Sequence, residues 1–340
     1  MYDITVIALP GAVGANCSRW LTTWAQDPRL PHRNQLALVF AFIAALFWGL
    51  LPLALQVVVP VLDTYTITWC RFLVAGLCVG LFLGTRNSLP RPWLLSRSLR
   101  ALLPIAVVGL TLNYTLFVVG VRLTSPATAQ VVIQSANLFV LLGGLIVYRE
   151  RFVQLQWLGA AVLIAGLLLF FNRRLPLIFD AGRSLGLGVL LLLIGSLTWA
   201  CYGLAQKRLL REWNSPQLLW LLYVGGALLL TPMAHPGQLR YLNATEGLAL
   251  LFCCANTLIA YGAYAEAMHL GEVTRVSATV AISPLFTALA SVLTAGWLAP
   301  RTSSDTPNLW TWIGVAAVVG GSALCALGAS SRAPLEAEWT

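Results

Sequence analysis

Three side-chain amides lie in one long apolar stretch, at a spacing that places them on the same side of a helix. They are Gln130, Gln134 and Asn137, and the spacing continues to Leu141. Amides in apolar surroundings are costly unless protein, water or a ligand satisfies them. The pattern therefore predicts one wall of a water-filled cavity. The alternative is that these amides only form hydrogen bonds between helices.

Arg71 is the one cation that we expect inside an apolar stretch, about seven residues from its start. Its guanidinium could bind a substrate carboxylate or phosphate through two parallel hydrogen bonds. Two other roles are open: the side chain could extend to the lipid headgroups, or it could pair with Asp63.

Aromatic residues form a second group of candidates. Trp48 and Trp199 lie near the middle of two apolar stretches, and Tyr114 and Tyr261 lie in two others. These rings could line the same cavity and stack on an apolar, aromatic or cationic solute. Plain packing between helices is the alternative for each of them.

Glu266 is the only acid that we place at membrane depth, near the inner end of its apolar stretch. A carboxylate there could carry the proton of a proton-coupled carrier. The alternatives are that Glu266 reaches the cytoplasmic interface or pairs with Arg275.

The elements that position these residues are long apolar helices. Of the 340 residues, 59% are hydrophobic and only 10% are charged, and the mean hydropathy is +0.80. Apolar runs of about 20 residues suit helices that cross a bilayer. We expect an all-helical membrane protein with ten spans: Leu36–Val59, Thr64–Gly84, Ala101–Val121, Pro126–Tyr148, Leu155–Phe171, Gly186–Gln206, Pro216–Pro232, Gly247–Met268, Val276–Leu298 and Leu309–Leu327.

The chain repeats itself. A shift of 147 residues places Tyr114 on Tyr261, and a shift of 151 places Trp48 on Trp199. Five spans per copy is an odd number, so the second copy enters the membrane inverted. We expect a cytoplasmic tail (1–35), a first repeat (36–172), a linker (173–185), a second repeat (186–328) and a second cytoplasmic tail (329–340).

The net charge of +9 lies mostly between the apolar runs. With both termini inside, most arginines fall on the cytoplasmic side, as the positive-inside rule requires. Arg173, Arg174 and Arg183 are the exception, because this drawing places their linker outside. The charge pattern indicates topology and contact with anionic lipids, and it does not favour binding of nucleic acid.

Several of these features resemble the EamA branch of the drug/metabolite transporter superfamily. They are FWG at Phe47–Gly49, RF at Arg71–Phe72, the duplicated signature that leads into the fourth helix, and YRER after Gly143–Gly144. The family's usual glutamate after the fourth span matches Glu150, whereas the second copy has Gly296–Trp297–Leu298 there. The resemblance implies a ten-helix inner-membrane carrier, usually an exporter of amino acids or other small metabolites.

We therefore predict a secondary transporter of a small organic solute. An enzyme is disfavoured because no HExxH, GxSxG or paired intramembrane carboxylates occur, and no ATP-binding motif, metal-ligand spacing or cofactor motif is present. A flippase for lipids or lipid-linked sugars on the same fold stays open. The fifth and tenth spans could be peripheral or could make a homodimer contact.

Overall fold

The computed structural model describes residues 31–90, 92, 97–147, 153–172, 184–210, 212–270, 273–294 and 308–330. Every regular element in these ranges is helical. The expected tails, apart from a few residues next to α2 and α14, lie outside the described residues, as does the linker from 173 to 183. The helices are α2 (Pro31–Val58), α3 (Thr64–Thr85), α4 (Arg97–Leu123), α5 (Pro126–Val132), η2 (Ile133–Ser135), α6 (Ala136–Val147), α7 (Gln154–Phe170), α9 (Ser184–Leu209), α10 (Ser215–Leu230), η3 (Thr231–Met233), η4 (Pro236–Tyr241), α11 (Ala244–Leu270), α12 (Val273–Val280), α13 (Ser283–Thr294) and α14 (Leu309–Ser330).

Six of these helices are long and apolar enough to cross a membrane: α2, α3, α4, α9, α10 and α11. Shorter apolar helices follow at Gln154–Phe170, Ala278–Thr294 and Leu309–Cys325. The helices begin and end within a few residues of the spans expected from the sequence. Length and hydropathy therefore located the helical segments well.

Polar residues set the starts of several helices. The Asp63 carboxylate accepts hydrogen bonds from the Tyr65 and Thr66 amides at the start of α3. At the start of α10, Asn214 Oδ1 accepts a hydrogen bond from the Gln217 amide, and Gln217 Oε1 accepts one from the Asn214 amide. These side chains satisfy amides that the first turn of a helix leaves without partners.

Two expected spans are interrupted near their middle. The fourth divides into α5 and α6 around η2, and the ninth divides into α12 and α13 at residues 281–282. The shift of 147 places 134–135 on 281–282, so both copies are interrupted at the same point. In the second copy the interruption precedes Pro284, which has no N–H to bond the Val280 carbonyl and whose ring would clash with that carbonyl in a continuous helix. The first copy has Asn137 at that position and only tightens into a 3₁₀ turn.

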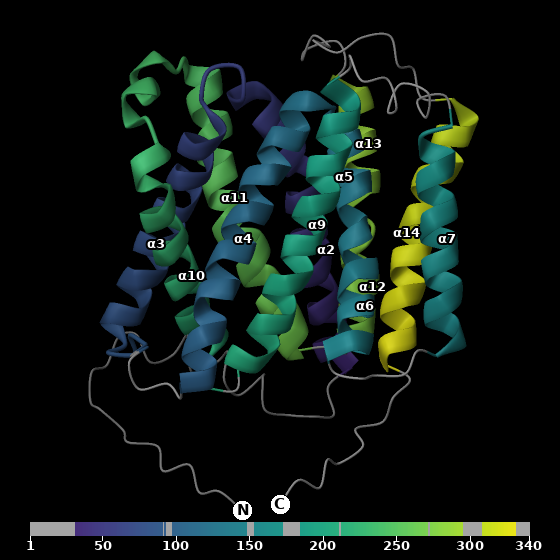
Figure 1. Ribbon diagram of the computed structural model, residues 1–340, viewed down its shortest axis with the longest axis horizontal. Coiled ribbons are helices and arrows are strands. Elements are labelled where there is room, and N and C mark those ends of the chain that lie inside the picture. The colour runs from purple at the N-terminus through teal and green to yellow at the C-terminus, as the bar shows by residue number, and fades with distance from the viewer. Residues whose placement is uncertain are drawn as a thin grey trace, which may run out of the picture.

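The helices pair across the two halves of the chain. α2 packs on α11 and α4 on α9, while α3 packs on α10 and α7 on α14. The repeat relates α2 to α9 and α4 to α11, so the pseudo-two-fold axis exchanges the α2–α11 pair with the α4–α9 pair. The α3–α10 and α7–α14 pairs each map onto themselves. In Figure 1, α2 begins at the lower edge and α9 at the upper edge. The two copies therefore run in opposite senses around a pseudo-two-fold axis.

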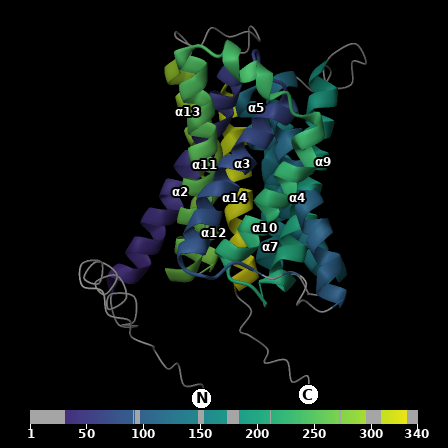
Figure 2. The same cartoon turned by 90° about the vertical axis from the view of Figure 1, so that its left-hand side faces the viewer.

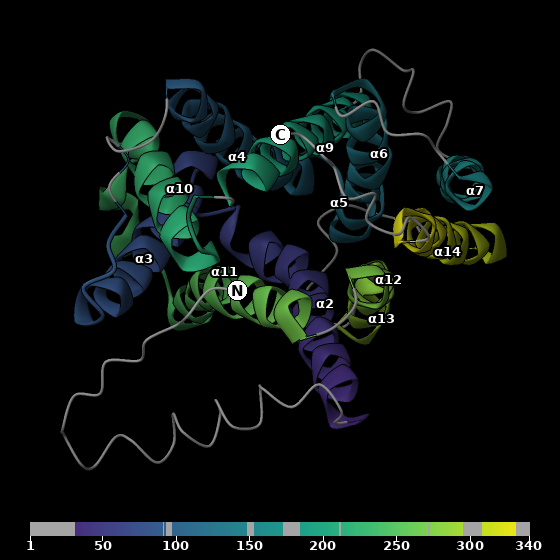
Figure 3. The same ribbon diagram turned by 90° about the horizontal axis from the view of Figure 1, so that it is seen from below.

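The bundle is elongated, with α3 and α10 at one end and α7 and α14 at the other (Figure 3). Figure 2 looks onto the α3–α10 end, with α2 and α11 on one side and α4 and α9 on the other. The interrupted helices lie between the central helices and the α7–α14 pair. This arrangement brings the middles of both copies to the centre of the molecule.

Candidate functional site

A cavity of about 210 Å³, here named the central cavity, lies at the meeting point of the two halves. All eight residues that the sequence predicts to bind solute line it; their role in binding stays a prediction. The lining residues are Trp48, Leu51, Arg71, Asn113, Tyr114, Phe117, Gln130, Ile133, Gln134, Ala136, Asn137, Trp199, Tyr261, Tyr264, Val280, Ala281 and Ser283.

Arg71 carries the only charge among the described residues that line the central cavity. The side chain is only 2% exposed. Its Nε–H donates to Thr257 Oγ1 at 3.2 Å, and its Cζ lies 4.5 Å from the centre of the Tyr114 ring. The Nη groups donate to none of the described residues. The two Nη groups of this buried cation are therefore free to bind a carboxylate through parallel hydrogen bonds.

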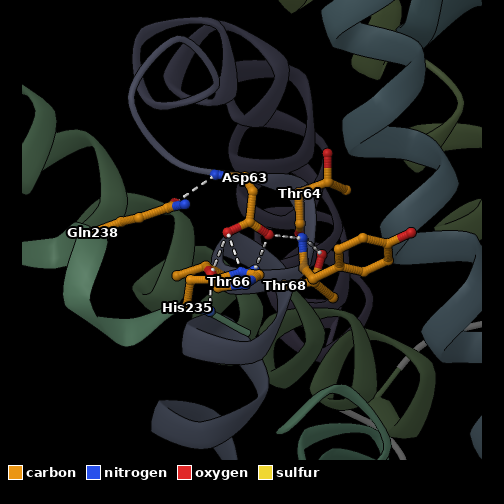
Figure 4. A network of polar contacts seen from close by, with 7 residues as sticks. Asp63, Thr64, Thr66, Thr68, His235 and Gln238 are labelled. Atoms are coloured by element: carbon orange, nitrogen blue, oxygen red, sulfur yellow. Dashed lines mark hydrogen bonds and ion pairs between the residues drawn. The ribbon is translucent and has the colours of Figure 1, made fainter. Parts of the chain in front are cut away.

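Asp63 is not the partner of Arg71. Figure 4 shows the Asp63 carboxylate turned toward Thr66 and His235. Asp63 Oδ2 accepts a hydrogen bond of 2.6 Å from Thr66 Oγ1 and lies 3.5 Å from His235 Nδ1. The burial of Arg71 also rules out an extension to the headgroups. Both alternative roles for Arg71 are thus wrong.

Two of the three amides bind the opposite half of the chain. Gln130 Nε2 donates to Ser283 Oγ at 3.0 Å, and Gln134 Nε2 donates to the Ala281 carbonyl at 3.1 Å. Gln134 and Ala281 occupy equivalent positions in the two copies, so this bond lies at the pseudo-two-fold axis. The amides thus combine both proposed roles: they line the cavity and they connect the interrupted helices.

The expected aromatic residues form one cluster. The ring of Trp48 lies 5.3 Å from that of Tyr261, and the ring of Trp199 lies 6.2 Å from the same tyrosine. The Tyr114 and Tyr261 rings are stacked at 6.3 Å. These rings give the central cavity an aromatic wall beside the Arg71 cation.

Sequence reasoning missed Asn113, a buried residue of the cavity wall. Its Nδ2 donates to the Gly195 carbonyl of α9 at 2.9 Å. The available signal was a lone amide beside Tyr114 in an apolar span. Ser283 was also missed, because a serine in an apolar helix is common and its partner Gln130 is remote in sequence.

Two segments of the chain, residues 35–172 and 186–327, match the EamA-like transporter family. The chain belongs to this family. The match confirms the resemblance inferred from the sequence, and it covers both copies of the repeat. This EamA-like transporter is thus a multi-pass membrane protein built from two family units.

Two curated relatives agree with this assignment. An "Uncharacterized transporter" of Haemophilus influenzae is 36% identical over 296 residues, which are 86% of this chain and 95% of that relative. The "Uncharacterized inner membrane transporter YhbE" of Escherichia coli K12 is 35% identical, with 86% and 92% covered. A solved crystal structure has a TM-score of 0.59 at 21% identity and covers 87% of this chain and 99% of its own. That likeness shows the fold alone.

Glu266 of this EamA-like transporter does not line the central cavity. Its exposed side chain lies near the end of α11 and lines a second cavity, between α3, α10 and α11. The side chain of Arg275, its alternative partner, is outside the described part of the structure. Glu150 and the segment Gly296–Leu298, which the family resemblance compared, also lie outside it.

Proposed function

We propose that this EamA-like transporter is a secondary carrier that moves a small organic solute with an acidic group, such as an amino acid, across the inner membrane. Arg71 carries the proposal, as a buried cation in the central cavity with its Nη donors free. A buried charge without a counterion is costly, and an anionic group on the solute would offset this cost.

The remaining cavity wall suits the rest of such a solute. Trp48, Trp199 and Tyr261 offer apolar ring surface, and Asn137 is exposed in the described structure. An amide can both donate and accept a hydrogen bond, so it can meet an amine or a hydroxyl. A solute with an acid at one end and a compact apolar or polar body matches this set.

We further propose ten membrane spans and alternating access between the two inverted halves. The pairing of every helix with one from the other copy supports this, as does the interruption of both copies at the cavity. Arg86 caps the end of α3, Arg100 lies in the first turn of α4 and Arg208 lies in the last turn of α9. These helix ends lie at the edge where α2 begins and α14 ends (Figure 1). On the positive-inside rule, we propose that this edge is cytoplasmic and that both tails lie on that side of the membrane. Export is the direction that the family resemblance implies.

Counterflow in proteoliposomes tests the proposed function. Vesicles loaded with an unlabelled amino acid, nucleoside or amine are diluted into the labelled solute, and transient accumulation is recorded. We expect accumulation of at least one solute with a carboxylate. Arg71→Ala should abolish that signal, whereas Arg122→Ala should retain it, because Arg122 is exposed at the end of α4 and lines neither cavity.

Two results would refute this function. Wild-type vesicles that scramble fluorescent lipids and accumulate no soluble solute would indicate a flippase. Equal loss of carboxylates and amines in Arg71→Ala would show that the arginine supports the fold rather than the choice of solute.

A further inference from the structure

The second cavity, here named the peripheral cavity, has a volume of about 490 Å³. It extends toward the edge of the bundle where α3 ends and α10 begins. α3 contributes Cys78, Val79 and Phe82 to its wall, and α10 contributes Ser215 and Leu219. The face of α11 completes it from Thr257 to Glu266.

The two cavities meet at a thin wall. Tyr261 lines both of them. Thr257 lines the peripheral cavity and accepts the Nε–H of Arg71, which lines the central cavity. The Tyr261 side chain therefore lies between the central cavity and the larger peripheral cavity.

The peripheral cavity also has open space next to this wall. Gly262 follows Tyr261 on α11 and lines the peripheral cavity. A Cβ atom added at Gly262 would meet no atom within 4 Å. The Tyr261 ring contacts three other rings at 5.3–6.3 Å, and the residue also lines the peripheral cavity.

We propose that the peripheral cavity is a second compartment of the solute's route and that Tyr261 is the partition between the two compartments. This rests on the proposed transport function and deepens it. The solute's acid binds Arg71 in the central cavity, and the solute reaches or leaves the peripheral cavity when the Tyr261 ring turns aside.

The charges of the two cavities narrow the class of solute. Thr257 and Glu266 are nine residues apart on α11, which is about 13.5 Å at 1.5 Å per residue. Glu266 is the only charged residue among the described residues that line the peripheral cavity. A solute with both an acid and an amine thus meets an attractive group in each compartment, whereas a dianion is repelled at Glu266.

Filling the peripheral cavity tests the proposal without disturbing the central one. Gly262→Leu places a side chain in open space. Gly320→Leu is the matched control, because Gly320 also has no atom within 4 Å of an added Cβ and its helix, α14, lines neither cavity. We expect Gly262→Leu to slow counterflow more than tenfold, while the Kd of the solute in detergent stays within twofold. Gly320→Leu should match wild type in both measurements.

Cys78 gives an independent reading, because it is exposed and lines the peripheral cavity. In a background with Cys17→Ser and Cys201→Ser, the rate of modification of Cys78 by a thiol reagent reports access to this space. We expect Gly262→Leu to slow the modification at least fivefold, and saturating solute to slow it in the otherwise unaltered protein.

The partition itself is tested by Tyr261→Ala. We expect faster efflux of preloaded solute without any external solute, because the two cavities are then joined, whereas Tyr261→Phe should keep efflux slow. Counterflow in Gly262→Leu as fast as in Gly320→Leu would overturn the proposal and leave the transport function standing. Absence of counterflow from wild type would overturn both. A block of lipid scrambling by Gly262→Leu, with solute counterflow intact, would assign the peripheral cavity to lipid.

Discussion

Replacing Gly321 by alanine should force α7 and α14 apart. These helices pack so closely that a Cβ atom at Gly321 would lie 2.4 Å from the Leu163 nitrogen and 2.7 Å from the Gly159 oxygen. Both are backbone atoms, so no side-chain rotation relieves the clash. Ordinary contact begins near 3.4 Å, and the helix pair must therefore separate by about 1 Å.

The cost follows from two opposing effects. Overpacking of a tight interface costs about 1–3 kcal/mol, while alanine in place of glycine in a helix gains about 1 kcal/mol. Gly320 is the neighbouring residue, and a Cβ atom there meets nothing within 4 Å. Gly320→Ala thus shows the helix effect alone, and the difference between the two variants isolates the clash at about 1–3 kcal/mol.

Thermal unfolding in one detergent, followed by circular dichroism and by the loss of monodisperse protein, measures this difference. We expect Gly321→Ala to unfold several degrees below Gly320→Ala. The pseudo-two-fold axis predicts the same effect at the equivalent glycine of the first copy. A shift of 155 residues, which places Trp157 on Trp312, also places Gly166 on Gly321. A Cβ atom added at Gly166 would lie 2.6 Å from the Val318 nitrogen. Gly166→Ala should therefore show a similar loss. Equal melting of Gly321→Ala and Gly320→Ala would refute the close packing of this pair.

Three further predictions concern the central cavity and its surroundings. Hydrogen bonds to charged groups contribute about 1.5–3 kcal/mol, so Arg71→Gln should raise the Kd for an acidic solute about tenfold to a hundredfold. Arg71→Lys keeps the charge and should raise the Kd less. Isothermal titration calorimetry measures both values. Gln134→Leu removes the bond to the Ala281 carbonyl and should lower stability by about 1 kcal/mol in thermal unfolding. Asp63→Ala removes the cap of α3 and should cost about 1 kcal/mol, whereas Asp63→Asn should retain most of that stability.

Sequence reasoning located the helices because long apolar runs are a local signal. It also gathered the cavity residues, since the repeat pairs Trp48 with Trp199 and Tyr114 with Tyr261. The FWG motif now has a physical account. Trp48 faces the central cavity, and a Cβ at Gly49 would lie 2.7 Å from the Ser283 oxygen of α13. Both residues thus position the same cavity wall.

Contacts between distant segments could not be predicted in this way. The bond from Gln134 to Ala281 depends on where the two interrupted helices cross, and nothing in an alanine marks its carbonyl as an acceptor. The peripheral cavity depends on the empty space beside Gly262. Glu266 was placed at membrane depth, but the direction of its side chain follows from the packing of α3, α10 and α11.

The repeat also shows which polar groups the fold does not require. The position equivalent to Arg71 is Leu222, and the position equivalent to Thr257 is Leu110. Both leucines are fully buried in one hydrophobic cluster. Two leucines therefore occupy the positions at which the other half has the Arg71 guanidinium bonded to the Thr257 hydroxyl. Apolar packing suffices there, so the fold of that half does not require a charge at the equivalent position. This asymmetry supports the proposal that Arg71 serves the solute, whose acidic group would supply the missing anion.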